Sequence, residues 1–175
     1  MTDKLIFTAF YPHPPERVWK ALTDPGALGL WLLPNDFKPV VGHRFKFETA
    51  DRLKGSAIEG LVTEVDEPKR IVYTWIDEDD GGAGQASRVS WSLRPKDGGT
   101  ELRLEHRPAA YVEPVVLIEA QMNWQFAMYC SLPAILALLE RGRPVRVPIV
   151  YVAEVPVSPE VEARRAGFRQ VVEAK

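Results

Sequence analysis

The chain has 175 residues, with 22 lysines and arginines against 24 aspartates and glutamates, for a formal net charge of −2. This length allows one domain with a single core plus an extension, and the near-balance of charge argues against a nucleic-acid partner. Residues 1–15 show no basic region followed by a long apolar run, and no unbroken apolar run reaches about 18 residues. We therefore expect no signal peptide and no membrane partner. The single cysteine, Cys130, excludes an internal disulfide and favours the cytoplasm.

The N-terminal quarter predicts one strand and two short helices. Apolar and aromatic residues over Lys4–Tyr11 are typical of a strand, and the prolines that follow end it. Glu16–Thr23 reads as a short helix, and Asp24 then caps a second one that opens at Pro25 and carries Trp31. Neither helix is long enough to be stable alone, so both should dock on a sheet.

Strand periodicity dominates the middle of the chain. Phe45 and Phe47 alternate with charged residues, which predicts a half-buried strand. Further strands are predicted over Ser56–Val65, Arg70–Ile76, Ser87–Leu93 and Thr100–His106. Asp97, Gly98 and Gly99 predict a hairpin turn, and consecutive strands with short turns pair as antiparallel neighbours. One face of such a sheet is wet and the other is dry.

A long helix is predicted over Glu119–Arg143. An apolar face recurs at helical spacing through Trp124, Met128, Leu132, Ile135 and Leu139. Pro133 lies inside the pattern and should kink the helix near Tyr129. We expect this helix to lie across a curved antiparallel sheet of about six strands and to close one wall of an apolar cavity. The predicted class is therefore α+β.

The residues after Pro144 follow a different pattern. Val147–Val155 reads as an extra strand, and Ser158 and Pro159 begin a sparse helical pattern that runs to Ala174. We expect a domain over residues 1–143 and a C-terminal extension over residues 144–175. The strand of this extension could add to a sheet edge in its own chain or in a neighbouring one. The outer apolar face of the long helix could pack across a twofold axis, so a homodimer is one expectation.

Five stretches resemble a known family. They are PHPPERVWKALTDPGAL (Pro12–Leu28), VGHRFKF (Val41–Phe47), GLVTEVDEPKRIVYTW (Gly60–Trp75), GGTELRLEH (Gly98–His106) and NWQFAMYCSLPAILALLE (Asn123–Glu140). Together they resemble the START-like, Bet v 1-like (SRPBCC) superfamily, and within it the bacterial relatives of the C-terminal domain of the Hsp90 ATPase activator. His13, His43 and Asn123 stand where that family usually has small residues. The likeness covers about residues 4–143.

The resemblance implies a helix-grip fold with a deep apolar cavity, often one that holds a small hydrophobic molecule. It does not imply one chemistry, because the superfamily includes ligand carriers, polyketide cyclases, self-sacrificing resistance proteins and co-chaperone domains. Large rings on the dry face favour a site for a flat apolar ligand. The candidate ligand-binding residues are Trp31, Phe45, Phe47, Tyr73, Trp75, Trp91, His106, Trp124 and Met128. Plain core packing is the alternative interpretation of the same residues.

No catalytic set is evident. The histidines His13, His43 and His106 lack metal-ligand spacing, and nothing in the sequence indicates a metal or another cofactor. His106 shares the dry face, where it would either exchange a proton with a ligand or serve as a structural histidine. Cys130 reads as an inert buried thiol rather than a nucleophile, since no cationic group is adjacent to it in sequence.

Three functional hypotheses follow. The first is a non-enzymatic carrier of a small hydrophobic or aromatic molecule. The second is a cyclase- or hydrolase-like enzyme in which His106, with Tyr73 or Glu105, moves protons in the cavity. The third is a chaperone-interacting domain that binds through an exposed surface rather than the cavity.

Overall fold

The computed structural model describes residues 4–48, 57–77, 86–108 and 114–141. Every element predicted before residue 143 is present, whereas the predicted extension over residues 144–175 lies outside the described residues. In chain order the elements are β1 (Leu5–Tyr11), α1 (Pro15–Thr23), α2 (Pro25–Trp31), β2 (Arg44–Glu48), β3 (Ala57–Asp66), β4 (Arg70–Asp77), β5 (Ser87–Lys96), β6 (Gly99–Arg107), α3 (Pro114–Phe126), the π-helical turn η1 (Ala127–Ser131) and α4 (Leu132–Glu140).

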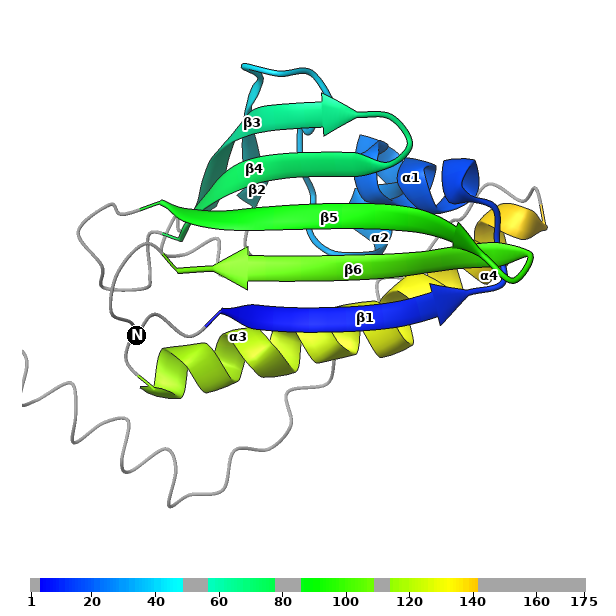
Figure 1. Ribbon diagram of the computed structural model, residues 1–175. Coiled ribbons are helices and arrows are strands. Elements are labelled where there is room, and N and C mark those ends of the chain that lie inside the picture. The colour runs from blue at the N-terminus through cyan, green and yellow to red at the C-terminus, as the bar shows by residue number, and fades with distance from the viewer. Residues whose placement is uncertain (1–3, 49–56, 78–85, 109–113, 142–175) are drawn as a thin grey trace, which may run out of the picture. The chain divides into compact units, whose positions relative to one another are not determined.

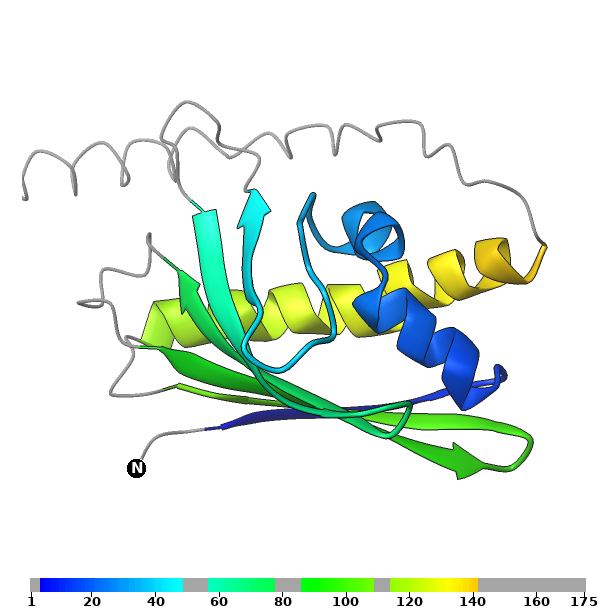
Figure 2. The same ribbon diagram turned by 90° about the horizontal axis from the view of Figure 1, so that it is seen from above.

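The six strands form one antiparallel sheet in the order β1-β6-β5-β4-β3-β2. The strands from β2 to β6 pair in sequence order, and β1 then closes the row against β6, with Phe7 opposite Leu104. The β5–β6 turn needs positive backbone φ angles, which Asp97 (48°) and Gly98 (76°) supply. Figure 2 shows the sheet strongly curved, with the long helix running across its concave side and α1 and α2 closing one end.

The long helix is interrupted where Pro133 predicts a kink. Pro133 has no N–H to donate to the carbonyl of Tyr129, four residues earlier. The chain accommodates this with η1, and the Leu132 N–H reaches back five residues to the carbonyl of Ala127. The helix begins at Pro114, five residues before its predicted start. Its β-branched opening, Val115 and Val116, obscures the helical pattern in the sequence.

Two tyrosine hydroxyls, one from β1 and one from η1, hydrogen-bond the long helix to the edge strand of the sheet. The buried Tyr11 hydroxyl donates a hydrogen bond of 2.6 Å to the Met128 carbonyl. In return, the Tyr129 hydroxyl donates to the Thr8 carbonyl on β1 at 3.1 Å. The inner face of the helix is fully covered at Leu132 and Leu136. Helix and sheet therefore share one core.

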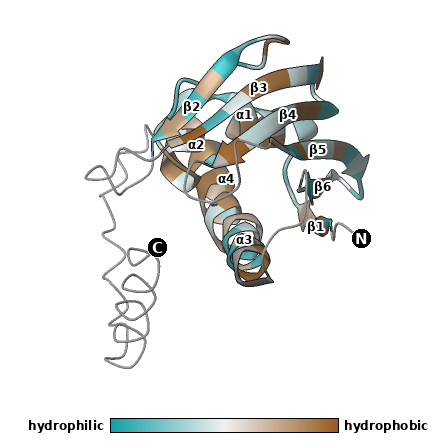
Figure 3. Cartoon of the chain, turned by 90° about the vertical axis from the view of Figure 1, so that its left-hand side faces the viewer, coloured by the Kyte–Doolittle hydropathy of each residue, from teal (hydrophilic) through white to brown (hydrophobic). Residues whose placement is uncertain are grey.

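Leu117–Glu140 is also long and apolar enough to cross a membrane, with a mean hydropathy of 1.3. Length and composition are weak evidence here, because the core helix of a globular protein passes the same test. Figure 3 shows the apolar positions of this helix facing the concave side of the sheet as well as its outer side. The side chains of Trp124, Met128 and Leu132 are buried in the core between helix and sheet, as expected for a core helix.

Candidate functional site

The structure brings all nine predicted ligand-binding residues into the space between the sheet and the helices. Eight of them are buried. The ninth, Trp75, is half-buried and packs against the core, where its ring contacts that of Trp124. Ring contacts link them across elements: Trp124 of α3 lies 5.4 Å from Trp75 of β4 and 5.6 Å from Trp91 of β5, centroid to centroid. Trp31 of α2 meets the other side of Trp91 at 6.2 Å.

One member of this cluster was not predicted. Phe37 lies in the segment between α2 and β2, and its ring stands 4.9 Å from Phe45 and 5.6 Å from Tyr73. The only signal in the sequence was an aromatic residue inside an otherwise polar, proline-bounded loop. Because a loop lacks the sequence periodicity of a helix or strand, the side of the chain on which Phe37 lies could not be predicted.

Rings fill the interior of the described domain rather than surround a space. Phe37, Phe47 and Trp91 are each 1 % exposed, and Met128 is 0 % exposed. A side chain lining a void large enough for water would show exposed surface, so these faces border none. Gly60 permits this packing, because a Cβ there would overlap the Phe45 ring and the Thr74 carbonyl. Among the described residues, the side chains expected to line a cavity contact one another instead.

Polar atoms in this interior are satisfied by one another. The Trp91 indole N–H donates to the Tyr73 hydroxyl at 2.7 Å, and burial raises the pKa of Tyr73. The Trp124 Nε1–H donates to His106 Nδ1 at 3.0 Å. His106 Nε2 therefore carries the proton of the neutral ring and donates it to Ser87 Oγ at 2.8 Å. Within the described residues, no buried side-chain N or O atom lacks a hydrogen-bond partner.

His106 is consequently a structural histidine in this geometry. Both ring nitrogens are engaged, and burial lowers its pKa from 6.5 to about 4. A general base that works near neutral pH needs a pKa near neutral and a free lone pair. The arrangement gives the predicted proton-transfer role no support.

The remaining histidines and the cysteine lie apart from this cluster. His13 is buried beside Arg17, and His43 contacts the Asp36 carbonyl at the surface. Cys130 is exposed on η1 rather than buried. The described part of the chain contains no group of three His, Cys, Asp or Glu side chains placed to hold a metal ion.

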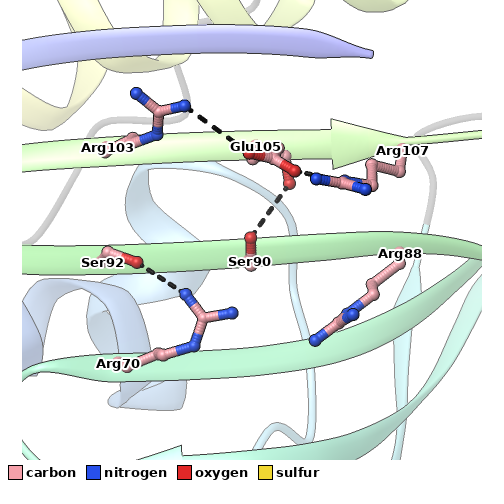
Figure 4. Close-up of a pocket in the computed structure, with 7 residues that line it drawn as sticks. All are labelled: Arg70, Arg88, Ser90, Ser92, Arg103, Glu105 and Arg107. Carbon is pink, nitrogen blue, oxygen red and sulfur yellow. Dashed lines mark hydrogen bonds and ion pairs between the residues drawn. The ribbon is translucent and has the colours of Figure 1, made fainter.

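A second feature lies on the opposite, outer face of the sheet. Arginines from β4, β5 and β6 surround a hollow of about 220 Å³ whose floor contains two serines (Figure 4). The lining residues are Arg70, Arg88, Ser90, Ser92, Arg103, Glu105 and Arg107. Sequence reasoning did not identify this hollow. The available signal was the run of Arg and Ser at every second position of β5, opposite Arg, Glu and Arg on β6.

The family model described as "Activator of Hsp90 ATPase homolog 1-like protein" matches residues 12–137, which is well over half of the chain. The chain belongs to this family. No curated protein matches it.

Solved structures agree with this family and with the α+β helix-grip fold. The protein MLL2253 from Mesorhizobium loti is 32% identical, with a TM-score of 0.69, and the match covers 81% of this chain and 99% of that one. PFC0360w from Plasmodium falciparum, described as an HSP90 activator, is 26% identical, with a TM-score of 0.64 and coverage of 77% and 96%. The Aha1 dimer from Colwellia psychrerythraea is 18% identical, with a TM-score of 0.63 and coverage of 76% and 96%, which shows the fold alone.

The buried His106 gives this family member a specific pH dependence. The folded protein binds a proton at His106 only near pH 4, whereas the unfolded chain binds it near 6.5. The unfolded state therefore gains protons first as the pH falls, and the free energy of unfolding decreases between these two values. We expect a loss of roughly 3 kcal/mol from this group.

Urea unfolding of the wild type and of His106→Gln at several pH values measures this effect. Glutamine keeps both an acceptor and a donor but does not titrate. The variant should lose less stability than the wild type between pH 6.5 and 4. Parallel pH profiles for the two proteins would contradict the assignment.

Proposed function

We propose that this protein is a non-enzymatic interaction domain that binds an Hsp90-type chaperone through its exposed surface. The observation that carries the proposal is the filled interior, in which rings occupy the space and the polar atoms pair with one another. Within the described residues, this core leaves no water-sized space beside these rings and no buried side-chain N or O atom without a partner. Family membership over residues 12–137 supplies the class of partner.

Binding to the Hsp90 of the source organism tests this proposal. We expect a dissociation constant of about 10 μM and stimulation of the chaperone's ATPase, because activators act on that reaction in the family description. Calorimetry and a coupled ATPase assay measure the two effects. Absence of both at several times that concentration would remove the proposal.

An interior variant provides the matched control. Trp124→Phe removes the hydrogen bond to His106 but leaves the exposed surface unchanged. It should lower the stability of the domain while chaperone binding persists. Loss of binding in a folded Trp124→Phe protein would point to the interior instead.

A small hydrophobic ligand is the second candidate, and one observation favours it. Trp75 is only half-buried, and its ring lies 5.4 Å from Trp124, so the aromatic cluster reaches the surface between β4 and α3. A flat apolar molecule stacking there would displace or extend the cluster at its edge. Thermal shifts with a lipophilic panel, recorded for the wild type and for Trp75→Ala, test this. A panel that leaves the wild-type melting temperature unchanged would exclude the candidate.

We also propose that the protein is cytoplasmic and forms a homodimer through the outer face of α3 and η1. Ile118, Met122, Phe126 and Tyr129 follow one another along this face and are each more than half exposed. Residues at this spacing lie on one side of a helix. Apolar stripes of this kind are commonly covered by a second copy across a twofold axis.

Sedimentation equilibrium tests the dimer. We expect the wild type to dimerise at micromolar concentration, and Met122→Glu with Phe126→Glu to be monomeric because two charges would be buried at the interface. Gln121→Glu, at an exposed position beside the stripe, should remain dimeric. A monomeric wild type would refute the proposal.

A further inference from the structure

The hollow on the outer face of the sheet brings together arginines from three strands. Figure 4 shows Arg70 and Arg88 on one side of the serine row, and Arg103 and Arg107 on the other. Neighbouring strands hold them there, since Ser92 pairs with Arg70 on one flank and with Arg103 on the other. The backbone register of three strands therefore fixes the position of the four arginines.

Two carboxylates neutralise only part of this charge. Glu64 contacts Arg70 at 2.8 Å and Arg88 at 3.8 Å, while Glu105 pairs with Arg107 and lies 3.6 Å from Arg103. Four guanidinium groups against these two carboxylates leave a local charge of +2. Burial raises the pKa of Glu105, but the positive charges of Arg107, Lys4 and Arg103 together lower it more, so this carboxylate stays ionised.

Most of the guanidinium donors remain available. Each arginine carries five N–H donors, and hydrogen bonds from these four reach only Glu64, Ser92 and Glu105 among the described residues. The side chains of Arg88 and Arg107 are each 56% exposed, so their guanidinium groups can reach an incoming anion. The Ser90 and Ser92 hydroxyls on the floor are small and polar, which leaves the space between the arginines open.

We infer that this hollow is a binding site for a phosphomonoester dianion. Its volume of about 220 Å³ accommodates a phosphate group and the first atoms of its ester. A dianion matches the local excess of two positive charges, whereas a single carboxylate does not. Arginine forks bind phosphate oxygens in pairs, and charge-assisted hydrogen bonds of this kind are the stronger class. This site goes beyond the chaperone interaction and does not depend on it.

Phenyl phosphate is the first probe, with benzoate as the monoanionic control of the same ring. We expect a dissociation constant of about 1 mM or lower for phenyl phosphate, and binding at least about tenfold weaker for benzoate. Backbone amide shifts of Ser90 and Ser92 in NMR spectra locate the site. Equal affinity for the two probes, or shifts that miss β4, β5 and β6, would overturn the inference.

Three variants separate a formed site from general positive charge. Arg88→Gln and Ser90→Leu should each weaken phenyl phosphate binding at least about tenfold, the first by removing donors and the second by filling the hollow. Arg44→Gln removes the same charge from the exposed side of β2 and should leave affinity unchanged. Melting curves confirm that each variant is folded. Equal weakening by Arg44→Gln, or full binding by Ser90→Leu, would refute the site.

The source of the phosphate can be distinguished in the same assay. A nucleoside monophosphate represents a free metabolite, and a phosphoserine peptide represents a modified partner protein. The compound that binds more tightly identifies the source. Either result supports the site, provided that Arg88→Gln weakens the binding of that compound. Failure of all three phosphate compounds to bind would overturn the inference, whatever the outcome with the chaperone.

Discussion

The long helix, with α1 and α2 at one end, has to cover the concave face of a curved six-stranded sheet, and the rest of the structure follows from that volume constraint. Aliphatic side chains alone would leave the deepest part of the curve uncovered. The chain fills it with rings from β2, β4 and β5, to which α3 adds Trp124. Because interiors are packed to crystal-like density, the described rings that contact one another leave no space for a ligand between them. The position of Trp124 is further fixed by its hydrogen bond to His106.

The sequence predicted much of this arrangement because alternation and helical spacing are local properties. Alternation along the strands predicted that Phe45, Phe47 and Trp91 lie on the dry face, and proline and glycine marked where strands end in turns. Whether those rings line a space or fill it depends on their rotamers and on contacts between distant segments. Phe37 shows the difference, since its place in the cluster is set by a loop without periodicity. The outer hollow is hidden for a related reason: it exists only when β4, β5 and β6 lie side by side in register.

The ring-filled interior differs from the cavity that the family resemblance led us to expect. A START-like fold is often associated with a cavity, but the fold fixes the course of the backbone and not the volume left between side chains. Here the polar groups that would recognise a ligand are already paired: Tyr73 with Trp91, and His106 with Trp124 and Ser87. Membership of the Hsp90-activator family is consistent with an interior of this kind, because binding a partner protein requires only an exposed surface.

Alternation along β5 lets the two faces of the sheet serve different purposes. Val89, Trp91 and Leu93 point into the core, while Arg88, Ser90 and Ser92 lie on the outer face. Successive side chains of a strand point to opposite faces, so a substitution at Ser90 alters the outer hollow without removing a core contact. Backbone pairing holds β4, β5 and β6 in register, and this pairing sets the spacing of the arginines around the hollow. We propose that the interior of this domain acts as a scaffold for recognition on the outer face.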